Sequence, residues 1–304
     1  MSILVVGSVA LDTVKTPFGQ AEEVLGGSAT YFSAAASFFT DVRLVAVVGE
    51  DFPEHHLAFL RSRKVDVRGL QRVPGKTFRW AGEYGFDLNQ AHTLDTQLNV
   101  FATFQPKLPP HYRKSPFLFL GNIHPELQSL VQSQMEAPQL IGGDTMNLWI
   151  ETTRPALERM LRGLNIVVIN DSEARMLSGE WNLAKAARAI RKMGPQTVVI
   201  KRGDNGASVY EEGHAFFAPA LPIEEVHDPT GAGDSFAGGF MGYLASQDGT
   251  NHPSSINQMR RAIVYGSVLG SFAVEQFGLE RLKHLTREEI DSRYREFQSL
   301  TRFE

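Results

Sequence analysis

From residue 228 the chain reads Asp228-Pro-Thr-Gly-Ala-Gly-Asp-Ser-Phe-Ala-Gly-Gly-Phe240, a glycine-rich turn followed by small and apolar residues. The segment from Asp234 to Ala245 is predicted to be a helix, so the free amides of its first turn and the positive end of its dipole converge on the turn. Gly231 and Gly233 lack side chains and let a ligand approach the main chain closely. This combination predicts a binding site for an anion such as a phosphoryl group.

Asp234 stands in the first turn of this helix, where a carboxylate would repel a bound phosphate unless it had a task of its own. A carboxylate close to a transferring phosphoryl group can accept the proton of an attacking hydroxyl. The alternative is that Asp234 only caps the helix, as Asp often does. The full string, which joins the glycines to the carboxylate, favours the base over the cap.

The string resembles the signature of the ribokinase family, also called the PfkB carbohydrate kinases, which reads D-T/P-T-G-A-G-D near the C-terminus. The resemblance implies that the amides of Gly231, Ala232 and Gly233 form the anion hole and that Asp234 is the catalytic base. It also implies a ribokinase-like α/β fold, a three-layer sandwich with a mostly parallel central sheet and a small β-sheet lid. The implied reaction is phosphoryl transfer from ATP, with Mg²⁺, to an alcohol.

Two other nucleotide-binding motifs lack support in the sequence. The stretch Gly69-Leu-Gln-Arg-Val-Pro-Gly-Lys-Thr77 approaches a Walker A loop but has five residues between its glycines where that loop has four. It follows no convincing strand and leads into Phe78-Arg-Trp80, which favours a strand, so we interpret it as a turn. No G-x-G-x-x-G occurs, because Phe236 stands where the third glycine would be, and a dinucleotide site loses its main support.

The composition of the 304 residues, 42% hydrophobic and 21% charged, is that of an ordinary globular protein with core enough for one large domain and an insertion. A net charge of -4 gives no sign of a nucleic-acid partner, and the absence of cysteine excludes disulfides and thiol catalysis. The nine histidines show no H-x-x-x-H spacing, so transition-metal catalysis is not expected. The N-terminal segment 1–7 reads as a buried strand with no leader or membrane anchor, and cytoplasmic residence is the expectation.

Short apolar runs alternate with amphipathic stretches, which is typical of strands joined by crossover helices. This pattern predicts a mostly parallel sheet with helices on both faces and ligands at the carboxyl ends of the strands. The predicted strands are Ile3–Val6, Val42–Val48, Phe117–Leu120, Gln139–Ile141, Ile166–Ile169 and Thr197–Lys201. The predicted helices include Ser28–Phe39, Pro53–Arg63, Thr153–Arg162, Leu183–Met193 and Ile256–Ala273.

One stretch, from about Arg72 to Phe104, breaks this alternation and reads as an inserted β-meander. Its expected strands are Lys76–Trp80, Glu83–Asp87 and Thr96–Phe104. The family resemblance implies a lid over the substrate, which we assign to residues 13–25 and 72–104 of a single kinase domain spanning 1–304. Such a sheet has exposed edges, and several relatives hide it by pairing lid to lid in a homodimer.

The resemblance assigns the substrate side of the site to residues near the N-terminus. Asp12 follows the first strand and would hold two vicinal hydroxyls, although an Asx turn is the alternative. Gly26 and Gly27 precede a helix and would let a ligand approach the backbone, or would only form a hinge. Relatives usually carry Asn four residues after the second glycine, and this chain has Tyr31 there. Tyr offers one hydroxyl and a ring instead of an amide, which favours a polyol other than ribose, a cyclitol or an aromatic acceptor.

Asn170 and Glu173 match the family's N-x-x-E motif where a buried strand turns into a helix. Their spacing places both side chains on one side of a first helical turn. Asn170 suits a phosphate contact, and Glu173 suits Mg²⁺ held through water. A helix cap with Glu at its third position is the alternative, and it is compatible with the first reading.

The resemblance places further residues around the nucleotide and at a cation site. Lys201 and Gly203 lie in a sharp turn after a strand and would line the ATP site, unless this is a plain surface turn. The segment Phe272–Gly278 weakly matches the adenine side, with Gly278 as its contact. Asp228 and Thr230 are candidates for a monovalent cation site such as many relatives use for K⁺.

The sequence therefore predicts an ATP-dependent kinase that phosphorylates a small sugar or sugar-like polyol. A nucleoside kinase of the same family is the first alternative, because four aromatic residues of the lid could stack on a base, although strand aromatics more often serve packing. These residues are Phe78, Trp80, Tyr84 and Phe86. A non-catalytic binding protein with the same fold is the second, but binding alone would not require Asp234.

Overall fold

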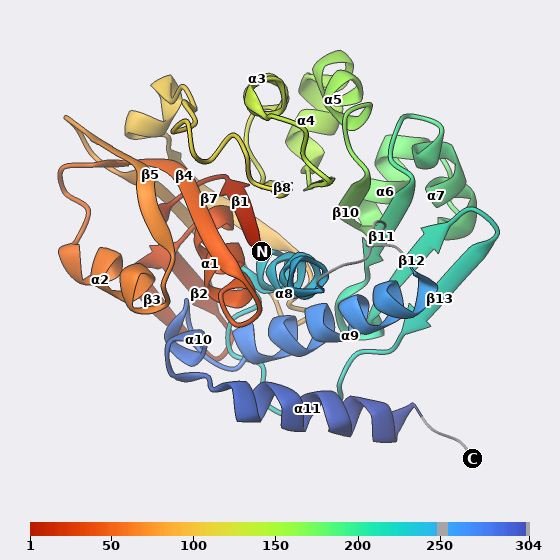
Figure 1. Ribbon diagram of the computed structural model, residues 1–304. Coiled ribbons are helices and arrows are strands. Elements are labelled where there is room, and N and C mark those ends of the chain that lie inside the picture. The colour runs from red at the N-terminus through yellow and green to blue at the C-terminus, as the bar shows by residue number, and fades with distance from the viewer. Residues whose placement is uncertain (248–254, 302–304) are drawn as a thin grey trace.

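The computed structural model describes residues 1–247 and 255–301, and its centre is a 9-stranded sheet in the order β13-β12-β11-β10-β9-β8-β1-β4-β5 (Figure 1). All neighbouring strands run parallel except β11 with β12 and β12 with β13. The strands are β1 (Ser2–Val6), β4 (Asp41–Gly49), β5 (Asp66–Val73), β8 (Phe117–Leu120), β9 (Leu140–Gly143), β10 (Ile166–Asn170), β11 (Thr197–Lys201), β12 (Ala207–Glu211) and β13 (His214–Ala218).

Helices cover both faces of this sheet, which explains why its inner strands are rich in buried apolar residues. In β1 the side chains of Ile3 and Val5 enter one hydrophobic core, and those of Leu4 and Val6 enter the other. The first core packs under α1 (Ser28–Ala36), α2 (Glu54–Ser62), α8 (Ala232–Ser246), α9 (Ile256–Ala273), α10 (Glu280–His284) and α11 (Arg287–Leu300). The second packs under α3 (Pro125–Gln134), α4 (Asn147–Thr152), α5 (Arg154–Leu161), α6 (Asp171–Ser178) and α7 (Leu183–Arg191).

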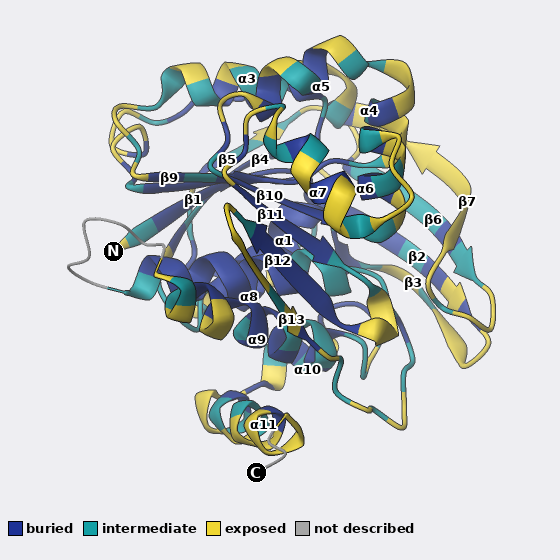
Figure 2. Ribbon diagram, turned by 90° about the vertical axis from the view of Figure 1, so that its right-hand side faces the viewer, coloured by how far each residue is buried: buried dark blue, intermediate teal, exposed yellow. Residues whose placement is uncertain are grey.

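A separate 4-stranded sheet, which we call the lid, stands at one end of the molecule and has the order β3-β2-β6-β7 (Figure 2). Its strands are β2 (Ala10–Thr16), β3 (Gly19–Gly26), β6 (Phe78–Tyr84) and β7 (Ala91–Gln97). The central pair β2 and β6 is parallel, and the outer strands β3 and β7 pair antiparallel with them. Every residue of β7 is exposed, so this strand forms an open edge.

The predicted strands and helices of the parallel sheet are present, with ends that differ by a few residues. Helix α8 begins two residues earlier than expected, at Ala232, and the strand expected at Gln139–Ile141 is Leu140–Gly143. Among the described residues, no helix combines the length and the apolar character that a membrane span requires.

The interpretation of Gly69–Thr77 as a turn is wrong for its first half, because Gly69 to Val73 form the end of strand β5. This strand is the edge of the large sheet and is only half-buried, so its sequence lacks the apolar run of an inner strand. This position of the strand requires a glycine, because a Cβ there would lie 2.6 Å from the carbonyl oxygen of Leu44 on β4.

The expected three-stranded meander of the lid is also wrong in part. Arg72 belongs to β5 of the large sheet, and Tyr84 ends β6, so the stretch Glu83–Asp87 is a strand end and a turn. The stretch Thr96–Phe104 contains the end of β7 and a 3₁₀ helix, η1 (Asn99–Thr103). The first lid segment begins at Ala10 rather than Thr13, because β2 continues almost directly from β1.

Close packing of α1 on α8 depends on glycines in α8. A Cβ at Gly238 would lie 2.4 Å from the carbonyl oxygen of Phe32, and one at Gly242 would lie 2.9 Å from the Cα of Ala36. The two backbones therefore approach each other more closely than larger residues would permit. This contact aligns the first turn of α8 with the start of α1.

We expect Gly238→Ala to destabilise the fold by about 1–3 kcal/mol, because the added methyl group meets backbone that cannot move aside. The midpoint of urea unfolding measures this loss. Gly85→Ala is the matched control, since a Cβ there meets nothing within 4 Å, and it should change stability by less than about 0.5 kcal/mol. Equal midpoints for the two variants would contradict the role assigned to the α1–α8 contact.

Candidate active site

The candidate active site lies where the carboxyl ends of the central strands meet the lid and the first turn of α8. Asn170 and Lys201 end the neighbouring strands β10 and β11, where they are paired in register. Asp234 lies in the first turn of α8. Asp12 lies on lid strand β2, close enough to Asp234 for the two charges to interact. The fold thus brings together residues that are more than 200 positions apart in the chain.

The turn before α8, where the sequence predicts an anion site, is formed by a glycine and the first helical residues. Gly231 precedes the first residue of α8 and has a left-handed backbone with φ of 73°. The side chain of Lys201 reaches this turn, since a Cβ at Gly233 would lie 2.6 Å from the Lys201 ammonium nitrogen. Helix amides, the helix dipole and an ammonium group therefore converge on one position, which favours a phosphate.

Asp234 is poised to exchange a proton near neutral pH. Burial raises the pKa of Asp234 from its ordinary 3.8 to about 6, and the positive charge of Lys201 opposes that rise. The residue keeps some solvent contact, although protein surrounds its carboxylate. A carboxylate with such a pKa can take up a proton from an alcohol during a reaction and release it afterwards.

Asp12 is buried, with only 5% of its surface exposed, and is held by Gly26 at the end of β3 and by Gly27 directly after it. A Cβ at Gly26 would lie 1.8 Å from Asp12 Oδ2, and the Gly27 amide hydrogen-bonds the same carboxylate. Gly27 itself has φ of 93° and packs on the carbonyl oxygen of Ser8. The glycines therefore leave room for protein groups, Asp12 above all, where a larger residue would not fit. Burial raises the pKa of Asp12 to about 7, and Asp228 and Asp234 add to that rise.

Tyr31 stands between the substrate side and the anion site. Its side chain is fully buried, and a Cβ at Gly231 would lie 2.4 Å from its ring. Its hydroxyl has no hydrogen-bond partner within the described residues, which leaves it available to form a hydrogen bond with a ligand. Burial raises the pKa of Tyr31 well above its ordinary value, and the nearby charges of Asp228 and Asp12 add to the rise.

Asp228 ties the anion-site turn to the segment around Gly278. Its carboxylate is fully buried and accepts hydrogen bonds at 2.9 Å from the amides of Thr230 and Gly278. Gly278 also contacts the lid, because a Cβ there would lie 3.1 Å from Val24 Cγ2. Gly278 therefore sits at the junction of the turn and the lid.

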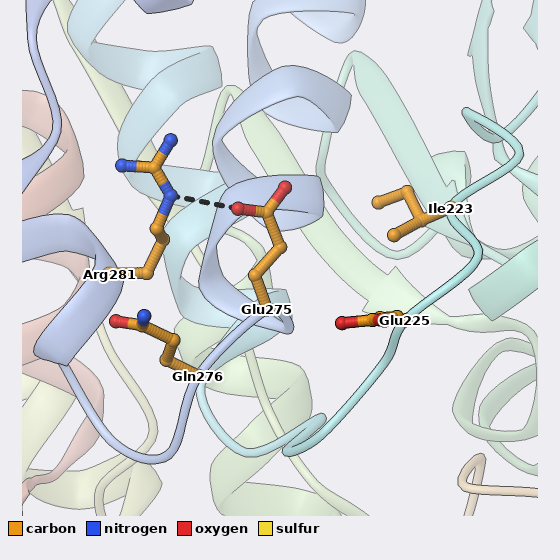
Figure 3. Close-up of a pocket in the computed structure, with 5 residues that line it drawn as sticks. All are labelled: Ile223, Glu225, Glu275, Gln276 and Arg281. Carbon is orange, nitrogen blue, oxygen red and sulfur yellow. Dashed lines mark hydrogen bonds and ion pairs between the residues drawn. The ribbon is translucent and has the colours of Figure 1, made fainter.

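A cavity of about 290 Å³ lies beside this junction (Figure 3). Two residues of the segment expected on the adenine side, Glu275 and Gln276, line it. Figure 3 shows Arg281 donating to Glu275 at its wall, over a distance of 2.8 Å. Ile223 and Glu225 complete the lining from the chain that leads into the anion-site turn.

Asn170 and Glu173 form a complete capping box at the start of α6. Asn170 Oδ1 accepts from the Glu173 amide, and Glu173 Oε2 accepts from the Asn170 amide, both at 2.8 Å. The amide nitrogen of the Asn170 side chain and the second carboxylate oxygen of Glu173 are not used by the box. Burial raises the pKa of Glu173, whereas the charge of Lys201 lowers it. The cap and a role toward phosphate or metal are therefore compatible.

Sequence reasoning missed Asp144, which joins this cluster from the end of β9. The residue is 5% exposed, and its Oδ1 is buried without a partner in the part of the chain that is described. Burial raises its pKa well above the ordinary value, with a further contribution from Asp234. Gln128 on α3 holds the segment by donating to the Asp144 carbonyl oxygen at 3.1 Å. The available signal was its position directly after a short apolar run, the same position that Asn170 occupies.

The lid is closed onto the body in this structure. Tyr84 at the end of β6 lies 3.3 Å from Thr230, oxygen to oxygen. In the loop after β6, Asn89 contacts the nucleotide-side turn, since a Cβ at Gly203 would lie 2.3 Å from Asn89 Oδ1. Thr16 on β2 donates to the carbonyl oxygen of His227 at 2.9 Å. The lid therefore touches both the anion-site turn and the turn expected to border the nucleotide.

The four lid aromatics have different surroundings. Phe78 stacks on Phe101 with ring centroids 5.2 Å apart, and Phe86 is 87% exposed in the loop after β6. Tyr84 enters the site, and its pKa is raised to about 12, mainly by burial. Trp80 lies four residues before Tyr84 on the same strand. Packing thus explains Phe78, and the two residues that remain near the site are Trp80 and Tyr84.

Comparison with known proteins gives a consistent picture. The family described as pfkB family carbohydrate kinase matches residues 126–284. The chain is 32% identical to the cytidine kinase of Thermococcus kodakarensis over 246 residues, which cover 79% of this chain and 87% of that protein. It is 38% identical to the 2-dehydro-3-deoxygluconokinase of Thermoproteus tenax over 247 residues, 75% of each.

Solved structures share the fold. The aminoimidazole riboside kinase of Salmonella enterica, solved with aminoimidazole riboside and an ATP analog, superposes with a TM-score of 0.75 at 16% identity. The superposition covers 97% of this chain and 100% of that one. At this identity the likeness concerns the three-layer architecture and the small sheet.

We expect Asp12→Asn to stabilise the fold at alkaline pH. The folded state holds a proton on Asp12 up to about pH 7, against an ordinary pKa of 3.8, so the free energy of unfolding falls as pH rises between these values. The substitution should raise that free energy by up to about 4 kcal/mol near pH 8 and change it little near pH 4. Urea unfolding at the two pH values measures both effects.

Asp66→Asn serves as a control of opposite sign. Hydrogen bonds from Arg68 hold the pKa of Asp66 below its usual range, so the ionised group stabilises the fold above its ordinary pKa. This variant should lose stability near pH 8. If the free energy of unfolding of Asp12→Asn equalled that of the parent protein at every pH, the assignment of Asp12 as a buried, protonated group would be wrong.

Proposed function

Since the chain belongs to the pfkB family of carbohydrate kinases, we propose that it transfers the γ-phosphoryl group of ATP to a hydroxyl group of a small sugar or sugar-like acceptor. One observation carries this proposal. Asp234, a carboxylate whose pKa is raised to about 6, stands in the helix turn that Lys201 and the glycine amides make attractive to phosphate. A base and an anion site in contact are what phosphoryl transfer to an alcohol requires.

The proposed reaction uses groups from both sides of the site. Asp12 and the Tyr31 hydroxyl hold the acceptor, and the lid closes over it. As the acceptor oxygen attacks the γ-phosphorus, Asp234 takes its proton, and the bond from that phosphorus to the β–γ bridging oxygen breaks. The products are a phosphate monoester and ADP. The amides of Gly231, Ala232 and Gly233 stabilise the charge on the transferring group.

Magnesium fits the acidic cluster beside Lys201. The described residues contain no group of three His, Cys, Asp or Glu that could hold a metal alone, so waters and phosphate oxygens would complete the shell. Glu173 and Asp144 would orient those waters, and the buried, unpartnered Oδ1 of Asp144 is suited to this task. Bound Mg²⁺ neutralises phosphate charge during the transfer.

The remaining nucleotide and cation assignments are part of the same proposal. Asn170 would contact phosphate with its free amide nitrogen, and Gly203 would border ATP together with Lys201. Asp228 and Thr230 would bind a monovalent cation such as K⁺ through oxygen lone pairs that their present hydrogen bonds leave open. Gly278 would contribute through its contact with Asp228 more than through an adenine contact.

Assembly and location extend the proposal further. The fully exposed edge strand β7 and the exposed Leu94 on it support a homodimer that pairs lid to lid. We place the protein in the cytoplasm, where ATP and phosphorylated sugars are retained. A net charge of -4 supports small molecules rather than nucleic acid as its partners.

A nucleoside kinase is the second candidate function, favoured by Tyr31 in the position of an acceptor-binding Asn and by the similarity to a cytidine kinase. A non-catalytic binding protein is a weaker candidate, because binding would not need Asp234 beside the anion site. Measuring ADP release with a panel of sugars, cyclitols and nucleosides separates these functions. A tight acceptor complex without ADP release in the presence of Mg-ATP would support the binding protein.

We expect Asp234→Asn to lower kcat by about three or more orders of magnitude and to leave the Kd for ATP largely unchanged, because the amide cannot accept the proton. Steady-state ADP release and calorimetric titration with ATP measure the two effects. Near-normal turnover in this variant would falsify the base assignment.

Asp144→Asn should raise the Mg²⁺ concentration needed for half-maximal activity by about 10- to 100-fold, because the carboxylate that orients bound water is lost. Activity titrated with MgCl₂ at saturating ATP gives this concentration. Asp41→Asn, which changes an exposed carboxylate at the amino end of β4, is the matched control and should leave the titration unchanged. Superimposable Mg²⁺ titrations for the two variants would contradict the role of Asp144 in magnesium binding.

A further inference from the structure

The pairing of the two central lid strands places an indole ring on the substrate side of the lid. In the parallel register of β2 and β6, Asp12 is paired with Trp80. Paired residues of neighbouring strands point to the same face of a sheet, and every second residue of a strand shares that face. Trp80 and Tyr84 therefore share the face of Asp12. Tyr84 marks this face as the inner one, because its hydroxyl reaches Thr230.

The ring of Trp80 is held flat along its strand. Its Nε1 donates to Thr93 on β7 at 3.2 Å. A Cβ at Gly82 would lie 2.3 Å from the Cζ2 and Cη2 atoms of the ring, so the indole covers the backbone of Gly82. Glycine inside a strand weakens it and often marks a close approach of this kind. The ring is half-buried, which leaves part of its surface without a packing partner of the kind that Phe101 provides for Phe78.

The charges around this face disfavour an anionic acceptor. The three carboxylates of Asp12, Asp228 and Asp234 all act on the Tyr31 hydroxyl, and none of the groups that act on Asp12 is a cation. The lid cation Arg79 is already paired with Glu23 at 2.7 Å and Asp51 at 2.9 Å. A sugar acid would therefore bring a further negative charge into an acidic pocket without a partner for it.

We propose that the acceptor is an uncharged nucleoside and that Trp80 is the platform on which its base stacks, while its ribose faces Asp12 and Asp234. This inference rests on the phosphoryl transfer proposed above and selects the acceptor for it. The preformed indole offers a wide apolar surface at little entropic cost. Any base can stack on this ring, so Trp80 favours acceptors that carry a base but does not distinguish one base from another.

Trp80→Ala should lower kcat/KM for cytidine and inosine by about 10- to 100-fold, the range expected for loss of one base–aromatic stack. With D-ribose, which carries an anomeric hydroxyl in place of the base, the change should be smaller than about twofold. Trp80→Phe should retain most of the nucleoside activity, and it keeps the proposal testable if the alanine variant folds poorly. Trp181→Ala is the matched control, because Trp181 is 82% exposed and contacts Arg175 rather than the lid. It should change none of these values.

Binding gives a readout that does not depend on turnover. Titration with cytidine should quench the tryptophan fluorescence of the unmodified protein and of Trp181→Ala, but not of Trp80→Phe. Quenching without phosphorylation of any acceptor would overturn the kinase and leave the platform in place. Phosphorylation of acceptors with no quenching, or a higher kcat/KM for D-ribose or D-gluconate than for nucleosides, would overturn the platform and leave the kinase in place.

Discussion

The contact between α1 and α8 is the constraint on which the site depends. Gly238 and Gly242 let the two backbones meet, and the same alignment brings Tyr31 against Gly231 at the start of α8. The buried ring thereby sets the position of the turn whose amides form the anion site. A larger residue at any of these glycines would move the turn relative to Asp12 and Lys201, which are held by other elements. The small residues of α8 therefore serve the site as much as the core.

The second constraint is electrostatic. Three acidic side chains, Asp144, Glu173 and Asp234, surround Lys201, and burial raises the pKa of each of them. Such an arrangement costs stability, because buried carboxylates are poorly solvated. The proposed chemistry gives a functional reason to keep them, since a bound Mg²⁺ would bring positive charge to these carboxylates and to the phosphates of ATP. The strain is concentrated at the site, while the two cores on either side of the sheet are apolar.

Elements that depend on local sequence were easier to predict than elements that depend on contacts between distant segments. The inner strands β1, β8, β10 and β11 were predictable because both of their faces are buried and each carries a continuous apolar run. The edge strand β5 was not, since most of its residues are only partly buried and Gly69 resembles part of a turn. The lid strands were located only approximately, because paired residues of β2 and β6 lie 68 positions apart in the sequence and no local signal gives that register.

The sequence by itself indicated the candidate anion site and the candidate base, because the glycines, the helix amides and Asp234 all lie within two turns of one segment. The family motifs at Asn170 and Glu173 were equally local. Only the tertiary structure brought Asp144 to this cluster, placed Tyr31 on Gly231 and turned Trp80 toward the face of Asp12. These contacts depend on strand order, helix packing and lid register, which are set by burial of surfaces far apart in the chain. The side chains proposed to select the acceptor come from such separate segments. The sequence therefore indicated the class of reaction, whereas the proposal for the acceptor depended on the fold.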